Sequence, residues 1–70
     1  MSAVLKINGT EKTFDEGLPS NLSELLAQLN IDAATVVAEI DGQIIERKNF
    51  EQTTLNEAQG IELIRFVGGG

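Results

Sequence analysis

The chain has 70 residues, enough for one small domain with a thin core, and it contains neither cysteine nor histidine. Disulfides, thiolate nucleophiles and zinc–thiolate sites are therefore excluded, and the most common general base and metal ligand is missing. Five basic side chains against eleven acidic ones give a formal net charge of −6. This balance argues against nucleic acid as a partner and favours a protein partner with a basic or mixed surface.

The N-terminal residues predict a β-hairpin. Residues 3–7 are strand-like, and Asn8 and Gly9 are residue types that a tight two-residue turn prefers, because both tolerate positive φ. Residues 10–15 continue as a second strand, in which Phe14 is expected to point toward the core while the acidic side chains face water.

One amphipathic helix is expected to follow the hairpin. Asn21 is the expected N-cap, and it places the Glu24 carboxylate at the third helical position, close to the positive end of the helix dipole. An apolar stripe at helical spacing predicts the face that packs against the core. It consists of Leu22, Leu25, Leu26 and Leu29.

The central part of the chain predicts a second hairpin. Residues 36–40 form the expected third strand, and Asp41 and Gly42 predict a turn into a short fourth strand over residues 43–46.

The C-terminal part begins with residues 47–55, which lack a clean period and are expected to be irregular or a turn of tight helix. Phe50 and Leu55 are expected to anchor this segment to the core. A turn at residues 58–60 then leads into the most β-prone run of the chain, residues 61–67.

The order of these elements predicts the fold class. A helix inserted after a hairpin, with further strands returning to the sheet, indicates an α+β fold in which one helix packs on one face of a mixed sheet. The domain is expected to span residues 1–67, and residues 68–70 are expected to be a flexible C-terminal glycine tail.

The sequence closes on Gly68, Gly69 and Gly70. Because glycine has no Cβ, such a tail can enter a channel too narrow for other residues and deliver its carboxylate into another protein's site. A carboxylate is a poor electrophile, but adenylation converts it into a mixed anhydride that a sulfur or nitrogen nucleophile can attack. The alternative is a frayed terminus without function.

Two segments carry a family resemblance: IDGQIIERKNF at residues 40–50 and IELIRFVGGG at residues 61–70. Together with the length and element order of the whole chain, they resemble the ThiS family, the ubiquitin-like sulfur carriers of thiamine biosynthesis. The resemblance implies a β-grasp fold with four to five strands. It also implies a protein that is not itself an enzyme and binds no cofactor.

The same resemblance implies the chemistry of the tail. Gly70 is expected to be adenylated by a ThiF-like enzyme that uses ATP, with Gly68 and Gly69 giving access to that enzyme. A sulfur-donor protein would then supply the sulfur of a C-terminal thiocarboxylate, and a ThiG-like thiazole synthase would accept it. The alternatives are a MoaD-like sulfur carrier for molybdopterin synthesis, a ubiquitin-like modifier of target lysines, and a β-grasp interaction domain with an inert tail.

The last strand also predicts a docking surface. Alternation places Ile61 and Leu63 on one face, and Ile64 and Phe66 on the other. If the helix covers the first pair, as the ubiquitin-like arrangement implies, Ile64 and Phe66 form an exposed apolar pair beside the tail. The alternative is that neighbouring side chains such as Arg65 shield one or both.

The remaining candidates for chemistry are weaker. The carboxylate pairs Glu39 with Asp41 and Asp15 with Glu16 are better explained as solvated surface acids than as acid–base or metal sites, so no metal is expected. Serine and threonine hydroxyls have no histidine to activate them. The N-terminal residues lack the segments of a leader or a membrane span, so a cytoplasmic protein without membrane contact is expected.

Overall fold

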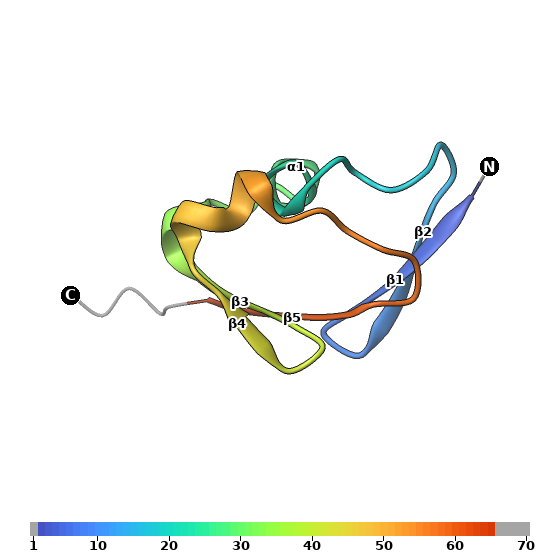
Figure 1. Ribbon diagram of the computed structural model, residues 1–70. Helices are drawn as coiled ribbons and strands as arrows, with labels where there is room; N and C mark the ends of the chain where they lie inside the picture. The colour runs from blue at the N-terminus through green and yellow to red at the C-terminus, as the bar shows by residue number, and fades with distance from the viewer. Residues whose placement is uncertain (1, 66–70) are drawn as a thin grey trace.

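The structure, a computed structural model, describes residues 2–65 (Figure 1). It confirms the expected order of strands and helix and adds a short 3₁₀ helix before the third strand that the sequence did not indicate. The elements are β1 (Ala3–Ile7), β2 (Thr10–Phe14), α1 (Leu22–Gln28), η1 (Ala33–Thr35), β3 (Val36–Ile40), β4 (Gln43–Ile45), η2 (Arg47–Gln52) and β5 (Gly60–Arg65).

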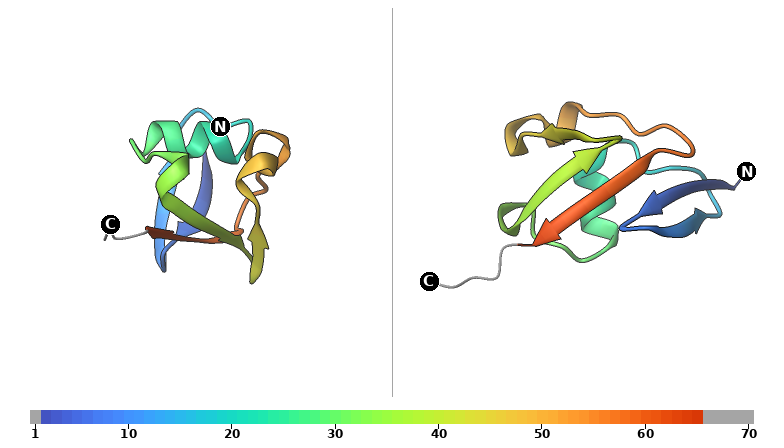
Figure 2. Two further views of the ribbon diagram at one scale, coloured as in Figure 1. Left: turned by 90° about the vertical axis from the view of Figure 1, so that its left-hand side faces the viewer. Right: turned by 90° about the horizontal axis from the view of Figure 1, so that it is seen from below.

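Within residues 2–65, five strands form one mixed sheet in the order β2-β1-β5-β3-β4. β1 and β5 run parallel, and the other neighbouring pairs are antiparallel. Helix α1 lies over one face of this sheet, and the view from below looks onto the other face (Figure 2). The expected α+β arrangement of one helix on a mixed sheet is therefore confirmed, with β5 as the central strand.

Both hairpin turns have the geometry that their sequences predict. Asn8 and Gly9 have φ values of 51° and 81°, and Asp41 and Gly42 have φ values of 50° and 87°. Two consecutive residues with positive φ form a turn whose twist matches the twist of the flanking strands. These turns fix the register of β1 with β2 and of β3 with β4.

Helix α1 is capped at both ends by asparagine. The Asn21 side chain accepts a hydrogen bond from the Glu24 backbone N–H at 2.8 Å, which confirms the expected N-cap. At the other end, Asn30 has a φ of 60°, and the backbone N–H of Ile31 donates to the Leu26 carbonyl at 2.9 Å. This is the hydrogen bond of a Schellman motif, and it ends the helix at Gln28, with Leu29 as the C-cap and Asn30 next in the chain.

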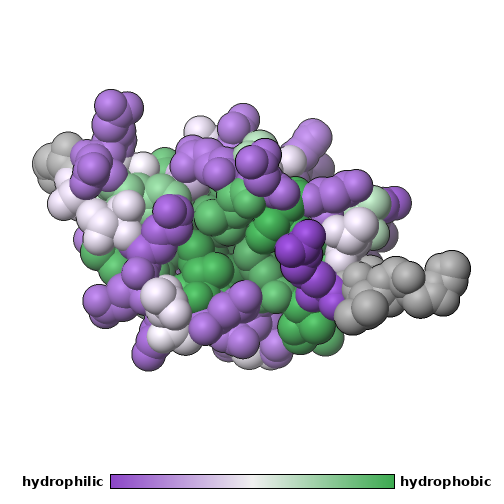
Figure 3. Space-filling model, turned by 180° about the vertical axis from the view of Figure 1, so that it is seen from behind, coloured by the Kyte–Doolittle hydropathy of each residue, from purple (hydrophilic) through white to green (hydrophobic). Residues whose placement is uncertain are grey.

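The core fills the space between α1 and the sheet. Leu22, Leu25 and Leu26 of the helix are buried, and Phe50 and Leu55 close the core from the segment between β4 and β5, as expected. On the side of the molecule seen in Figure 3, apolar residues reach the surface across the middle. The sheet contributes Leu5, Phe14, Val36, Ala38, Ile40, Ile61 and Leu63.

Replacement of isoleucine by alanine should change the free energy of unfolding differently on the two faces of the sheet. Ile61 is 0% exposed, so Ile61→Ala should lower the free energy of unfolding by about 2–5 kcal/mol through lost burial and a cavity. Ile44 is 66% exposed, so Ile44→Ala should change it by about 0.5 kcal/mol or less. Urea unfolding followed by circular dichroism measures both values, and equal losses would contradict the assigned faces.

Candidate partner-binding face

The face of the sheet turned away from α1, here called the open face, is defined by alternation along β3 and β5 and by the pairing of β4 with β3. Residues of β3 and β5 alternate between buried and accessible, so that every second side chain points away from the helix. On β3, β4 and β5 the open face consists of Val37, Glu39, Ile44, Glu62 and Ile64.

Ile64 lies on the open face, and 54% of its surface is exposed. Ile61 and Leu63, its neighbours on the opposite face, are buried, so the alternation expected for β5 is present. The structure therefore contradicts the alternative in which Arg65 or another side chain shields Ile64 from water. Phe66, the second residue of the expected apolar pair, lies outside the described residues.

Ile44 is a second exposed apolar residue that the sequence analysis did not single out. It lies on β4, directly opposite Glu39 of β3, while Ile45 packs against the core. A signal for it was present in the sequence. Adjacent isoleucines in a two-faced strand cannot both point inward, so one of the pair Ile44 and Ile45 must face water.

Two glutamates lie side by side at the centre of the open face. Glu39 of β3 and Glu62 of β5 are direct partners in the antiparallel pairing of these strands. Like charges directly opposite each other on neighbouring strands are unfavourable. Among the described residues the one ion pair joins Lys48 and Glu46 at 3.9 Å, so neither Glu39 nor Glu62 forms an ion pair with a described basic side chain.

Asn8 holds the C-terminal half of β5 in place. Its side-chain oxygen Oδ1 accepts from the backbone N–H of Leu63 at 2.7 Å, and its Nδ2 donates to the Leu63 carbonyl at 3.4 Å. The backbone N–H of Asn8 also donates to the Ile61 carbonyl at 2.8 Å. β1 ends at Ile7, and the side-chain amide of Asn8 then bonds the backbone of β5 at Leu63 in place of a further β1 residue.

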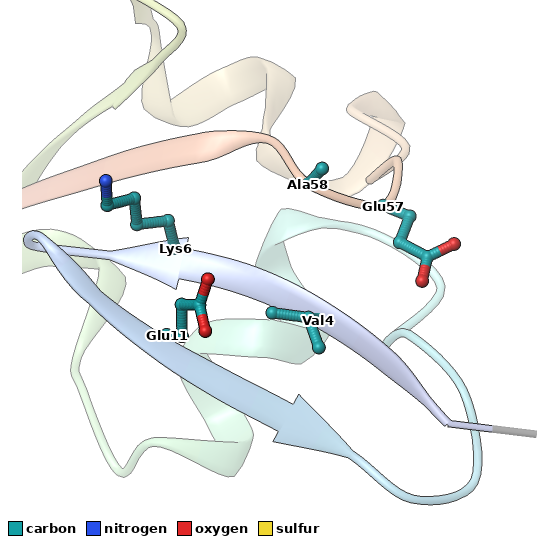
Figure 4. A pocket seen from close by; sticks show the side chains of 5 residues that line it. All are labelled: Val4, Lys6, Glu11, Glu57 and Ala58. Carbon is teal, nitrogen blue, oxygen red and sulfur yellow. The ribbon is translucent and has the colours of Figure 1, made fainter.

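A separate hollow of about 480 Å³ lies at the other end of the sheet, beside β1 and β2. Figure 4 shows that Lys6 and Glu11 project from neighbouring strands, while the Glu57 carboxylate points away from both. The charged groups do not converge on one point, so this hollow does not have the arrangement of a catalytic site. It is lined by Val4, Lys6, Glu11, Glu57 and Ala58.

The carboxylate pairs considered from the sequence do not form a site either. The Asp41 carboxylate accepts a hydrogen bond from the Gly60 backbone N–H at 2.9 Å and so links the β3–β4 turn to the start of β5. Asp15 and Glu16 are both exposed. Over residues 2–65 no cluster of three carboxylates could hold a metal ion.

No helix within residues 2–65 has the length and apolar character needed to cross a membrane. The tail residues Gly68, Gly69 and Gly70, and the expected boundary between residues 67 and 68, lie outside the described part of the chain.

Comparison with known proteins decides the family. The model of the ThiS family matches residues 3–70, which is nearly the whole chain. The chain belongs to the ThiS family. The match includes the strand β5, Ile64 and the three terminal glycines.

Relatives of this ThiS family member include proteins of different lengths. The sulfur carrier protein ThiS of Bacillus subtilis is 27% identical over 67 residues, covering 96% of this chain and all of that protein. A thiazole synthase of Paramagnetospirillum magneticum is 30% identical over 66 residues, covering 94% of this chain. The chain spans only 20% of the length of that synthase.

Solved structures confirm the β-grasp fold of the ThiS family. The crystal structure of the thiamine biosynthesis protein ThiS from Geobacter metallireducens is 35% identical, with a TM-score of 0.82. The alignment covers 96% of this chain and 99% of that one. The solution structure of a thiamine biosynthesis protein from the same organism gives a TM-score of 0.79.

Replacing Asn8 tests its role on β5. Asn8→Gly keeps a residue that adopts positive φ and removes both side-chain hydrogen bonds, so it should lower the free energy of unfolding by about 1 kcal/mol. The backbone amide of Leu63 should also exchange its hydrogen faster, which NMR measures residue by residue.

Asn30→Gly is the matched control for this substitution. Asn30 also has positive φ, and within the described part of the chain its side chain makes no hydrogen bond. Its replacement should therefore change stability by about 0.5 kcal/mol or less. Equal losses at both asparagines would show that the hydrogen bonds of Asn8 to Leu63 contribute nothing.

Proposed function

We propose that this chain is a sulfur carrier of thiamine biosynthesis whose working group is the C-terminal carboxylate of Gly70. The observation that carries the proposal is the match to the ThiS family from residue 3 to residue 70, since it includes both the folded domain and the glycine tail. The Bacillus subtilis relative, which aligns over its whole length, carries the name sulfur carrier protein ThiS.

The proposed chemistry has two steps at one carbon atom. An oxygen of the Gly70 carboxylate attacks the α-phosphorus of ATP, which forms a C-terminal acyl adenylate and releases pyrophosphate. Hydrosulfide supplied by the sulfur donor then attacks the same carbonyl carbon and forms the C–S bond, AMP leaves with the electrons of the C–O bond, and the remaining S–H proton is lost to water. The resulting thiocarboxylate carries sulfur toward thiazole formation.

In this proposal, catalysis belongs to the partners and the chain acts as their substrate. The sequence has no cysteine and no histidine, and within residues 2–65 no three carboxylates form a group that could hold a metal ion. Gly68 and Gly69 supply a narrow, unbranched approach to the activating site, because neither carries a side chain. ATP is bound by the activating enzyme, and the carrier needs no cofactor of its own.

Three partners follow from the proposed chemistry: a ThiF-like adenylating enzyme, a sulfur-donor protein and a ThiG-like thiazole synthase. The Paramagnetospirillum relative supports the third, since a protein named thiazole synthase contains a segment similar to almost this entire chain.

Ile64, together with Phe66, is the proposed apolar docking surface beside the tail. The exposure of Ile64 supports this assignment.

Intact-protein mass spectrometry tests the proposed function. After incubation with a ThiF-like enzyme, ATP and a sulfur donor, the chain should gain the mass difference between one sulfur and one oxygen. A target-sized adduct would instead indicate a protein modifier, and an unchanged mass would contradict the sulfur-carrier proposal.

Gly69→Leu tests the role of the tail. The added side chain should block entry into the activating site and abolish adenylation, measured as ATP–pyrophosphate exchange, while circular dichroism and the unfolding midpoint stay unchanged. Ser2→Leu adds the same side chain near the opposite end of the chain and should leave adenylation intact. Normal exchange by the Gly69→Leu variant would rule out a narrow channel for the tail.

A further inference from the structure

The turn between β1 and β2 contains the one place in the chain where an asparagine precedes a glycine, Asn8-Gly9. The other asparagines precede larger residues, whose side chains crowd the backbone nitrogen that follows the asparagine. Glycine leaves this nitrogen unshielded. Both turn residues are exposed, and a Cβ placed on Gly9 would meet no heavy atom within 4 Å apart from its chain neighbours. The pair therefore has the residue types and the access to water that cyclisation of an asparagine side chain requires.

The reaction open to this pair is deamidation through a cyclic imide. The backbone nitrogen of Gly9 attacks the side-chain carbon Cγ of Asn8 and forms a C–N bond. The bond from Cγ to Nδ2 breaks, and ammonia leaves with the electrons of that bond and with the proton of the Gly9 N–H. Water then adds to either carbonyl carbon of the five-membered ring and breaks its C–N bond, which leaves aspartate or isoaspartate. Water is the one co-reactant.

The folded turn holds the reacting atoms apart. Positive φ values of 51° at Asn8 and 81° at Gly9 are those of a type I′ turn, in which the first central residue has a ψ of about 30°. At this ψ the Cβ of Asn8 and the nitrogen of Gly9 lie on nearly opposite sides of the Cα–C bond of Asn8. Ring closure requires both atoms on the same side. The imide can therefore form only after the backbone of the turn has rotated.

Hydrogen bonds to β5 oppose that rotation. The backbone N–H of Asn8 donates to the Ile61 carbonyl at 2.8 Å, and the side-chain oxygen of Asn8 accepts from the Leu63 N–H at 2.7 Å. Nδ2, the atom that leaves as ammonia, donates to the Leu63 carbonyl at 3.4 Å. Rotation about the Cα–C bond has to pull Asn8 away from β5 or carry β2 out of the sheet. Either movement breaks hydrogen bonds, so opening of the turn is a condition of the reaction.

We propose that Asn8 is a site of spontaneous deamidation, and that its contacts with β5 keep it intact while the protein is folded. The residue reacts in the fraction of molecules in which the turn has left β5. Because reclosing is much faster than imide formation, the reaction rate follows the equilibrium population of this open form. The inference concerns the folded domain and holds whether or not the tail carries sulfur.

Deamidation removes contacts that prevent it. An aspartate product has no donor for the Leu63 carbonyl and places a carboxylate against it. An isoaspartate product adds one atom to the backbone of a two-residue turn, so the pairing of Ile7 with Thr10 cannot keep its geometry. Either product carries one more negative charge than the original chain. Modified chains should therefore open more readily, and anion exchange can separate them.

Peptide mass spectrometry tests the effect of folding on the rate. The full chain is incubated in mildly alkaline buffer with and without concentrated guanidinium chloride, and samples are digested with trypsin. Cleavage after Lys6 and Lys12 releases residues 7–12, in which Asn8 is the only side-chain amide. We expect Asn8 to deamidate at least about tenfold more slowly in the folded chain. Equal or faster reaction in the folded chain would overturn the proposal, and faster reaction of another asparagine in the denatured chain would place the site elsewhere.

Hydrogen exchange identifies the contact that controls the rate. The factor by which folding slows deamidation should match the protection factor of the Leu63 backbone amide within about tenfold, because both reactions require the same opening. A much smaller slowing would mean that Asn8 reacts while it is still bound to β5, and would contradict the proposed control.

A matched pair of variants changes the open population without altering the turn. Ile61 is 0% exposed and Ile44 is 66% exposed. Ile61→Val should speed the deamidation of Asn8 about two- to tenfold, whereas Ile44→Val should leave the rate about unchanged. Equal rates in both variants would sink the proposal. The acidic fraction from anion exchange should also unfold at a lower urea concentration than the unmodified chain, and equal midpoints would contradict the loss of the β5 contacts.

Discussion

The structure depends on the packing of one short helix against one face of the sheet. Three leucines of α1 cover the inner side chains of the strands, and no second α-helix among residues 2–65 is present to cover the other face. A strand that is buried on one side must alternate, so residues that face water on β3 and β5 are fixed as firmly as those in the core. The open face is therefore a direct consequence of the core, and its isoleucines and glutamates cannot be hidden without losing the register.

This arrangement suits a protein whose reactive group lies outside its fold. The domain provides a rigid sheet with a distinctive surface, and the proposed reaction takes place on a carboxylate at the end of the chain. In the proposed function the partners supply the catalytic groups, so the chain would need only to be recognised and to present its tail.

Local sequence patterns predicted much of this fold because the determining interactions are local. Asn21 and Glu24 are three residues apart, and the Asn8-Gly9 and Asp41-Gly42 turns are set by their own backbone preferences. The clamp of Asn8 on Leu63 was not predictable in this way, since it joins residues 55 positions apart. The same holds for the opposed glutamates, because their contact depends on the register between β3 and β5.

The central position of β5 has a mechanical consequence. In the proposed function, a partner that draws the tail into its active site would pull on the chain beyond Arg65, along the axis of a strand bonded to β1 on one side and β3 on the other. Hydrogen bonds between strands lie across that direction, so the load is shared among them and they cannot open one after another. The clamp of Asn8 adds two bonds near the loaded end. We therefore expect the domain to stay folded if its tail is placed under tension.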